Sequence, residues 1–559
     1  MSLYNLKINL NNKRFQGELM FSLPQQEEKR LELANTFIIL AITLLGTFLR
    51  FQYLQKSDFV INDGGMFYTM ILDLERNNYL LPMFTSYNQS QIPFAYPPLS
   101  FYEGAFINQF LHVDLITIFR WYPLIFNILS IPAVYFLSME IVRKTKQAII
   151  STGFYAILLP GFEWLISGGG LTRSPAHTFF IISFTLYLAF LRTREKKHLI
   201  FSIFTGALMT LHHIEYCWML VFSSVLFSFY KWKIKENLGP LLLFFFGIGI
   251  LTAPYWVVIL LKHGPEPFLS AFSAGEFNFL STFARLTILV FTEETLIAFI
   301  NVLAIIGLLY CLFTKNFIIV IWLVLIGFLN PRSANRSLIF PVVILASIAI
   351  DELICPALDN LRTSQVENSE KKSKIKLFTK ADPKLYSHLF ILFAFGFPFF
   401  LGFINTLGIH PVLSMLPQQE LEALQWIRDN TDKNGVFVVL NPSIEWHMDK
   451  LGEWFPALTN RKSLTTIQGT EWLPDSTFEK EKIIYDEFKE CAKTGETCLA
   501  EWELKNHNKF DYLVVSRVNG SMNSQDIGLK FFIKTVEESE KYDCIYTNDV
   551  INIYKKKGN

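Results

Sequence analysis

Long apolar runs, separated by short polar segments, fill most of the chain up to residue 408. A run of about 15–25 apolar residues is long enough to cross a bilayer as a helix. About eleven runs approach this length, at Leu33–Tyr53, Leu115–Met139, Ala148–Ile166, Pro175–Leu191, Leu199–Leu211, Ile214–Tyr230, Leu238–Leu261, Phe291–Phe313, Phe317–Leu329, Leu338–Ile354 and Leu389–Leu407. Leu199–Leu211 and Phe317–Leu329 are short for a full crossing, so each also fits half of a re-entrant or broken helix. The pattern predicts a polytopic α-helical membrane protein.

The composition agrees with a membrane protein. Of the 559 residues, 51% are hydrophobic, 16% aromatic and only 18% charged, and the mean hydropathy is +0.31. A soluble chain of this length would carry more charge. The Lys clusters lie between apolar runs and lack the interleaved aromatic residues of a nucleic-acid surface. We therefore expect the lipid bilayer as a partner and no nucleic acid.

The positions of Lys and Arg predict the orientation of the chain. With the N-terminal segment 1–30 in the cytoplasm, the basic loops all fall on the inner side, those at Lys29-Arg30, Arg143–Lys146, Arg192–Lys197, Lys231–Lys235, Lys315 and 356–386. This arrangement satisfies the positive-inside bias. It places the polar loop 56–112 and everything after about residue 408 outside. We expect a multi-pass protein of the cell membrane with a membrane domain at 31–408 and an extracytoplasmic region at 409–559.

The extracytoplasmic region mixes helical and strand patterns. Gln418–Asn430 has the apolar spacing of an amphipathic helix. Gly435–Leu440 and Phe510–Val515 predict buried strands, and Tyr546–Ile551 predicts a hairpin turn. This order predicts a small soluble α/β domain after the membrane domain.

Three cysteines, Cys491, Cys498 and Cys544, lie in this region. An oxidising exterior permits a disulfide, and the short loop between them favours the pair Cys491 and Cys498.

Polar residues that do not belong near lipid gather on the predicted outer side. They lie in the segments Asn62–Gly65, Gly161–Trp164, Gly168–His177, His212–Tyr216 and Asn330–Arg336. A carboxylate at the edge of a bilayer is costly unless it is paired or used. Carboxylates, histidines and arginines at one membrane face indicate an anionic substrate held by Arg and a reaction run by a carboxylate.

Each of these groups also has a simpler interpretation. Asp63 within Asn-Asp-Gly-Gly is also typical of a turn, and the arginines also fit as interface anchors that reach lipid headgroups. The cluster of His212, His213 and Glu215 resembles a metal site by residue type, but its spacing is not the His-Glu-x-x-His of a zinc helix. A polar bridge between two short helices fits this cluster equally well.

The chain resembles the GT-C superfamily of membrane glycosyltransferases, in particular the prokaryotic family 39-like, protein-mannosyltransferase-like branch. The resemblance covers nearly the whole chain and rests on the order of several motifs, no one of which is highly specific. They are Asp63 in a long first exterior loop, Tyr96-Pro97-Pro98-Leu99, Gly168–Arg173, Leu211–Glu215, Glu453–Leu458 and Gln468–Leu473.

The resemblance implies a sugar donor carried on a polyprenyl phosphate and an acceptor that is a protein, a lipid or a glycan. It implies that Asp63 is the general base of an inverting transfer, with Glu163 as a second acidic residue. The candidates for the donor phosphate are Arg173, Arg332 and Arg336, and those for other substrate contacts are Tyr96, His177, His213, Glu215 and Trp472. No cofactor is certain. A divalent cation, Mg or Mn, stays open, with Asp63, Glu163 and His212 as its candidate ligands.

One departure narrows the expected activity. The Trp-Trp-Asp-Tyr-Gly motif of oligosaccharyltransferases is absent from the exterior region. Transfer of a single hexosyl or pentosyl unit is therefore favoured over transfer of a whole glycan. A lipid-linked glycan transporter or flippase and a non-catalytic envelope protein are the alternatives. Against a transporter, we find no convincing inverted repeat, and the charged groups lie at one face rather than at mid-membrane.

Overall fold

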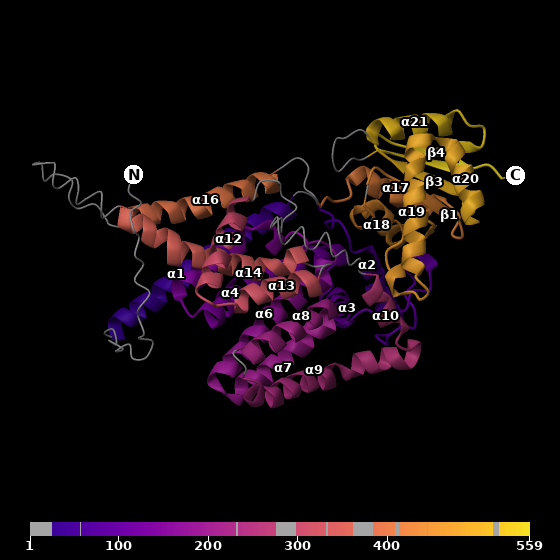
Figure 1. The fold of residues 1–559 in the computed structure, drawn as a ribbon. Helices are drawn as coiled ribbons and strands as arrows, with labels where there is room; N and C mark the ends of the chain where they lie inside the picture. The colour runs from indigo at the N-terminus through magenta and orange to yellow at the C-terminus, as the bar shows by residue number, and fades with distance from the viewer. Residues whose placement is uncertain are drawn as a thin grey trace, which may run out of the picture.

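The computed structural model describes residues 25–55, 58–230, 233–274, 298–330, 334–361, 384–407, 413–443, 445–517 and 525–558. A bundle of apolar helices forms one part of the molecule, and a C-terminal domain with a β-sheet forms the other (Figure 1). Helices α2, α3 and α10 lie between these two parts (Figure 1). The predicted fold class, a polytopic helical protein with a C-terminal α/β domain, is confirmed.

Each predicted apolar run overlaps a helix of the bundle. These helices are α1 (Gln25–Leu54), α4 (Leu115–Val142), α5 (Thr145–Ile157), α6 (Gly170–Thr193), α7 (Lys196–His212), α8 (Ile214–Phe229), α9 (Ile234–His263), α12 (Ala298–Phe313), α13 (Ile318–Leu329), α14 (Ala334–Ala349) and α16 (Leu385–Leu407). Among the described residues, 6 helices are long and apolar enough to cross a membrane, and α8, α12 and α13 are shorter apolar helices. The span count of about eleven therefore stays a prediction.

The run predicted at Ala148–Ile166 differs from the structure. Helix α5 ends at Ile157, and a short 3-10 turn follows at Leu159–Gly161. Pro160 explains the early end, because proline has no N–H to continue the helical hydrogen bonds and its ring would clash with the carbonyl of Ala156, four residues earlier. Helix α6 then begins at Gly170, five residues before the predicted start at Pro175. The polar segment between the two helices therefore begins earlier and also ends earlier in the chain than the hydropathy pattern indicated.

Contacts between loops fall into two groups that match the predicted sides of the membrane. At one end, Arg192 contacts Glu140 and Arg194 contacts Glu236. Lys144 pairs there with Glu352, and Tyr230 donates to Asn316. At the other end, the contacts join the loop 56–112 to residues around Gly168, His212 and Tyr255, and Tyr53 of α1 donates to Glu163. The grouping agrees with the alternation of predicted spans, while the side that faces the cytoplasm stays a prediction.

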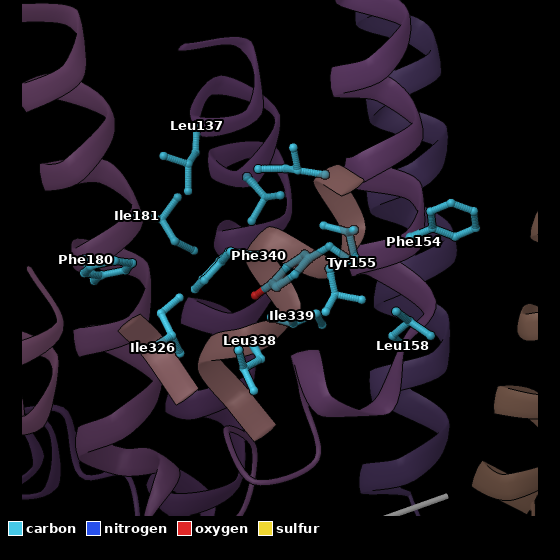
Figure 2. Packing of buried hydrophobic residues seen from close by; sticks show 14 of the residues in the cluster. Leu137, Phe154, Tyr155, Leu158, Phe180, Ile181, Ile326, Leu338, Ile339 and Phe340 are labelled. Atoms are coloured by element: carbon cyan, nitrogen blue, oxygen red, sulfur yellow. The ribbon is translucent and has the colours of Figure 1, made fainter. Parts of the chain in front are cut away.

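Aromatic and branched side chains form the core of the bundle. Figure 2 shows Phe340 of α14 beside Tyr155 of α5, with Phe180 and Ile181 of α6 on the other side. The rings of Tyr155 and Phe340 stack with centroids 6.1 Å apart, and those of Phe180 and Phe340 are 5.8 Å apart. This packing holds α14 between α5 and α6. The first turn of α6 is the part that reaches the candidate site.

The exterior loop 56–112 is largely structured. It contains α2 (Gly65–Arg76), a 3-10 turn at Tyr87–Gln89 and α3 (Leu99–Leu111), and α10 (Glu266–Ser273) lies close by. The aromatic and aliphatic residues of this loop share one buried cluster with part of the C-terminal domain. The loop is therefore a packed connector between the membrane bundle and the C-terminal domain, which we call the exterior domain after its predicted location.

The C-terminal domain is a five-stranded sheet with helices on both faces. Its strands follow the order β2-β1-β3-β5-β4, with β1 parallel to β2 and β3, and β5 antiparallel to β3 and β4. The elements are α17 (Gln418–Asn430), β1 (Val436–Leu440), a 3-10 turn (Trp446–Met448), α18 (Lys450–Thr459), β2 (Lys462–Ser463), a 3-10 turn (Thr470–Trp472), α19 (Thr477–Thr494), α20 (Glu496–Asn506), β3 (Tyr512–Ser516), α21 (Gln525–Glu537), β4 (Tyr542–Thr547) and β5 (Ile551–Lys556). The predicted helix at 418–430, both strands and the hairpin turn are all present.

The two faces of the sheet pack against different partners because side chains alternate along a strand. Phe437 and Val439 of β1 face α17, α18 and the exterior loop, in one buried cluster with Trp454. Val438 and Leu440 face α19, α20 and α21. On that second face, Cys491 is joined to Cys498 by a disulfide, the pair that the sequence favoured.

Candidate active site

Asp63 lies in a tight turn where the exterior domain meets the membrane bundle. The preceding residue, Asn62, has φ 53° and the following residue, Gly64, has φ 119°, both in the left-handed region. Asn and Gly tolerate this region better than other residues. The Asn62 amide donates to Ser414 O at 2.9 Å, and Asn62 O accepts from Trp454 Nε1 at 2.9 Å. The turn is thus held from the exterior domain.

The Asp63 carboxylate is buried and has two partners on the other side of the turn. Its Oδ1 accepts from the Gly169 amide at 2.8 Å, and its Oδ2 pairs with Arg173 Nη2. Gly169 is the N-cap residue of α6, where the helix dipole favours a negative charge. The fold therefore brings Asp63, the Gly-rich segment and Arg173 together. All three lie in polar segments that were predicted from the sequence as parts of the site.

The glycines of Gly168-Gly169-Gly170 are required by this close approach. A Cβ atom on Gly168 would overlap the backbone carbonyl of Asp63. A Cβ on Gly169 would overlap both the Asp63 carboxylate and the Arg173 guanidinium. The segment is not a nucleotide loop, because no strand precedes it. Its function in this fold is to let the backbone reach the carboxylate.

Arg173 is oriented by further contacts. Its Nη1 donates to Trp164 O at 3.2 Å and to Ser167 Oγ at 3.4 Å, and its guanidinium lies 5.8 Å from the Trp164 ring centroid. Burial acts to raise the pKa of Asp63, but Arg173 and the Gly169 amide outweigh it and hold that pKa below its usual value. Asp63 is therefore ionised at neutral pH.

Glu453 is a site residue that the sequence did not single out. This buried carboxylate, on the first turn of α18, accepts from the Gly64 amide at 2.7 Å through Oε1. Burial and the charge of Asp63 raise the pKa of Glu453 to about 8. The sequence carried only a weak signal, a glutamate in the apolar motif Glu453–Leu458. Asp63 and Glu453 thus have opposite pKa shifts on the two sides of Gly64.

A second cluster of predicted residues lies around Tyr96. The Tyr96 ring is 5.7 Å from His213 and 5.5 Å from Trp472, centroid to centroid. Its hydroxyl lies 3.3 Å from Thr172 Oγ1, one residue before Arg173. Near His213, Glu215 pairs with Arg336 at 3.5 Å. Trp472 comes from the exterior domain, so this cluster also spans both parts of the molecule.

Other predicted residues lie apart from Asp63. Glu163 accepts from the Tyr53 hydroxyl at 3.2 Å. His177 is fully buried in the bundle, where its two ring nitrogens contact the hydroxyls of Tyr155 and Tyr216. Arg332 lies outside the described residues. The structure therefore gives no substrate-facing surface to His177 and adds nothing about Arg332.

The candidate metal ligands are not gathered at one point. Asp63 is paired with Arg173, Glu163 contacts Tyr53, and His212 contacts Ser100. Within the described ranges, no group of three or more His, Cys, Asp or Glu side chains is arranged to hold a metal ion. The residues present do not fit the proposed set, so we derive no step through a metal.

Comparison with known proteins places this geometry in context. A family model described as a 6-pyruvoyl-tetrahydropterin synthase related domain, a membrane protein, matches residues 95–272. That segment includes α4 to α10, and its description as a membrane protein agrees with their apolar character. No curated protein matches the chain.

Three solved structures share the fold. The oligosaccharyltransferase AglB from Archaeoglobus fulgidus, in complex with an inhibitory peptide and a dolichol-phosphate, has a TM-score of 0.54 and 14% identity over 87% of this chain and 69% of that chain. ArnT from Cupriavidus metallidurans, bound to undecaprenyl phosphate, has a TM-score of 0.50 and 11% identity over 93% and 97%. The arabinofuranosyltransferase AftD from Mycobacteria has a TM-score of 0.52 and 12% identity, and the match covers 93% of this chain but only 40% of that chain. The chain therefore shares its fold with these three enzymes, which agrees with the fold that the resemblance in the sequence implied.

Proposed function

We propose that this protein is a membrane glycosyltransferase that moves one sugar from a polyprenyl-phosphate donor to an acceptor hydroxyl. The observation that carries the proposal is the ionised Asp63 carboxylate, which is buried beside Arg173 where the bundle and the exterior domain meet. The fold supports it, because structures with this fold come from glycosyltransferases, two of them with a polyprenyl-type phosphate bound. Low identity makes the substrate a proposal and not a consequence of the fold.

In the proposed reaction, Asp63 is the general base. The acceptor oxygen attacks the anomeric carbon and forms a new C–O bond while the bond from that carbon to the phosphate oxygen breaks. The acceptor proton passes to the Asp63 carboxylate, and the polyprenyl phosphate leaves with the electron pair. Attack opposite the leaving group inverts the anomeric centre. A base for this step needs to be ionised and positioned, and Arg173 and the Gly169 amide provide both conditions.

The negative charge that develops on the leaving phosphate needs to be stabilised by cations. Arg173 at the first turn of α6 and Arg336 at the start of α14 are the described candidates, and Arg332 is a further one. Each described arginine is paired with a carboxylate, so it would bind the phosphate through other N–H groups of the same guanidinium while it holds Asp63 or Glu215 in place. Glu163, Tyr96, His213 and Trp472 are proposed to contact the sugar or the acceptor.

The direct test is a transfer assay with purified protein and a panel of radiolabelled polyprenyl-phosphate sugars. Each reaction is run with and without a chelator, and the product is identified together with its anomeric configuration. We expect transfer of one hexosyl or pentosyl unit with inversion. Retention would contradict the base role of Asp63, and a folded protein that uses no donor in the panel would contradict the function. Loss of activity with the chelator, restored by Mg or Mn, would show a metal requirement.

We also propose that the protein resides in the cell membrane and that its exterior domain lies on the side away from the cytoplasm. Cys544 of β4 is exposed, whereas Cys311 and Cys355 are buried in the bundle. A membrane-impermeant maleimide added to intact cells is therefore expected to label Cys544. Labelling of Cys544 only after the cells are opened would contradict this orientation. A Cys544→Ser variant is the control for labelling elsewhere.

A further inference from the structure

A groove on the outer side of α3 is separate from the Asp63 cluster. It has a volume of about 720 Å³ and is lined by Tyr79, Tyr102, Glu103, Phe106, Ile107, Phe110 and Tyr122. Apart from Glu103 these residues are aromatic or aliphatic, and Glu103 is the charged residue among those described around it. The groove is therefore a mostly apolar channel with one acidic group.

The groove opens toward the bilayer. Phe106 and Phe110 on its rim are 53% and 61% exposed. Along α4, Ile125 and Leu129 follow Tyr122 at helical spacing and are also exposed. Because α4 is long and apolar enough to cross a membrane, this exposed stripe faces lipid chains. A hydrocarbon chain from the bilayer can thus continue into the groove without crossing a polar surface.

At the acidic end of the groove, two hydrogen-bond acceptors face each other, His212 Nε2 and Glu103 Oε2. Ser100 Oγ donates to Leu171 O at 2.9 Å, so toward His212 Nδ1, 2.7 Å away, it acts as the acceptor. The hydrogen of a neutral His212 ring is then on Nδ1, and Nε2 presents a lone pair. This Nε2 is buried and has no hydrogen-bond partner among the described residues.

The lone pair of His212 Nε2 faces Glu103. Its distance from Glu103 Oε2 is 3.8 Å, which is too long for a hydrogen bond. Glu103 Oε2 already accepts from the Tyr122 hydroxyl. Burial raises the pKa of Glu103, although the Tyr122 hydroxyl opposes the shift, as expected for a carboxylate without a cation nearby. Among the described residues, no donor that carries a positive charge lies at this end of the groove.

We propose that this groove binds a phospholipid with a primary ammonium headgroup. The acyl chain fills the aromatic channel, and the ammonium group donates hydrogen bonds to Glu103, at the position beside His212. A primary ammonium has three N–H donors, whereas the quaternary ammonium of a choline lipid has none. The site thus distinguishes lipids of the same net charge by hydrogen-bond donation. It is independent of the proposed transfer reaction.

Native mass spectrometry of the full-length protein tests this inference. The protein is released from nanodiscs that contain equal amounts of phosphatidylethanolamine, phosphatidylcholine and phosphatidylglycerol with the same acyl chains. We expect phosphatidylethanolamine to be retained about tenfold over phosphatidylcholine, the factor for one charge-assisted hydrogen bond of about 1.5 kcal/mol. In Glu103→Gln this preference should disappear. In Ile107→Trp, which fills the channel, retention of all three lipids should fall.

The control variant is Glu422→Gln, which changes an exposed carboxylate of α17 far along the chain from the groove. It should keep the wild-type preference. Equal retention of phosphatidylethanolamine and phosphatidylcholine by the wild type would overturn the headgroup assignment. An unchanged preference in Glu103→Gln would also overturn it, and unchanged retention in Ile107→Trp would exclude the channel. A thermal unfolding scan of each variant confirms that it is folded before its lipid content is compared.

Discussion

Two carboxylates at the start of α18, those of Asp449 and Glu453, differ in the charges and hydrogen-bond partners around them. Asp449 caps α18 and faces the interior of the exterior domain, while Glu453, one turn later, faces Asp63. Asp449 Oδ1 accepts from Asn441 Nδ2 and from the Gly452 amide at 2.7 Å. Asp449 Oδ2 accepts from Tyr485 at 2.8 Å and pairs with Lys489 at 3.2 Å.

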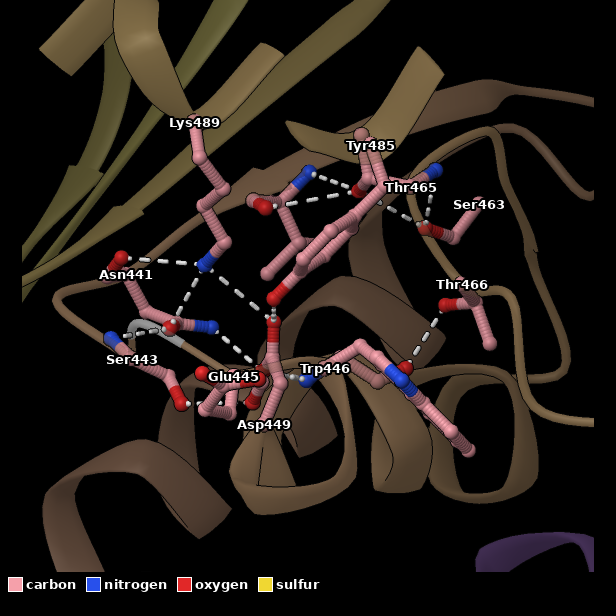
Figure 3. A network of polar contacts seen from close by, with 12 residues as sticks. Asn441, Ser443, Glu445, Trp446, Asp449, Ser463, Thr465, Thr466, Tyr485 and Lys489 are labelled. Atoms are coloured by element: carbon pink, nitrogen blue, oxygen red, sulfur yellow. Dashed lines mark hydrogen bonds and ion pairs between the residues drawn. The ribbon is translucent and has the colours of Figure 1, made fainter. Parts of the chain in front are cut away.

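Lys489 completes this network (Figure 3). Its ammonium group also donates to Asn441 O at 3.0 Å and to Asn441 Oδ1 at 2.9 Å, so its three donors all have acceptors. One negative charge is thus matched by one positive charge, and each polar atom has a partner. A buried network of this kind makes a domain rigid.

The cluster at Asp63 is not balanced in this way. Among the described residues, Arg173 pairs with Asp63, whereas its charge acts only to lower the pKa of Glu453, with no ion pair between the two. One carboxylate is held ionised and the other has its pKa raised. Groups with such opposed shifts are typical of acid–base sites, whereas matched networks are typical of structure. The comparison teaches that charge balance, and not burial, distinguishes the candidate site from the structural network.

The largest expected effect follows from Arg173→Leu. This change leaves the Asp63 carboxylate buried without a cation, so we expect the free energy of unfolding to fall by about 3–5 kcal/mol. Turnover should fall at least about a hundredfold, because the leaving phosphate loses a cation and Asp63 loses its orientation. Denaturant unfolding in detergent and the transfer assay measure the two effects.

The double variant Asp63→Leu/Arg173→Leu sharpens this result, because it removes both charges. It should recover part of the lost stability but none of the activity. Wild-type turnover in Arg173→Leu would show that the pair is only structural, like that of Asp449 and Lys489.

A smaller effect, on stability alone, is expected for Asp449→Asn. It leaves Lys489 buried without a counter-charge, so the unfolding free energy of the exterior domain should fall by about 3 kcal/mol. Adding Lys489→Met should recover part of this loss. Turnover per folded molecule should stay at the wild-type value at a temperature below the transition. A large fall in turnover of the folded Asp449→Asn protein would erase the distinction between the two regions.

The smallest effect, counted per pH unit, concerns pH and Glu453→Gln. The pKa of Glu453 is raised to about 8, so between about pH 4.5 and 8 the folded protein keeps a proton that the unfolded chain has released. The free energy of unfolding therefore falls as the pH rises through this window, by at most about 1.4 kcal/mol per pH unit. In Glu453→Gln this part of the pH dependence should be absent. An identical slope in the variant and the wild type would mean that Glu453 is ionised throughout.

The sequence predicted the fold well because apolar runs and strand patterns are local signals. The helix Gln418–Asn430 and strands β1 and β3 were found from spacing alone. The boundary between α5 and α6 was missed, since that segment is shaped by Pro160 and by the approach of Asp63 to Gly168.

Within the candidate site, the sequence identified Asp63, Arg173 and the glycines because they stand out near apolar runs. Glu453 stayed hidden, since its role depends on a contact with Gly64, 389 positions away in the chain. His177 was predicted as a substrate contact because it ends the polar segment Gly168–His177, but one helical turn after Arg173 its side chain is already inside the bundle. Long-range packing, which no local pattern encodes, decided both cases.

Asp63→Asn tests the central claim most directly, because it keeps the size of the side chain and the Gly169 contact while removing the base. The rate of sugar transfer in a single turnover is measured for Asp63→Asn and for Asp449→Asn, with unfolding curves for both. We predict a fall of about 10²–10⁴ in the rate for Asp63→Asn, the range for loss of a general base, and no fall for folded Asp449→Asn. A wild-type transfer rate in folded Asp63→Asn would contradict the account.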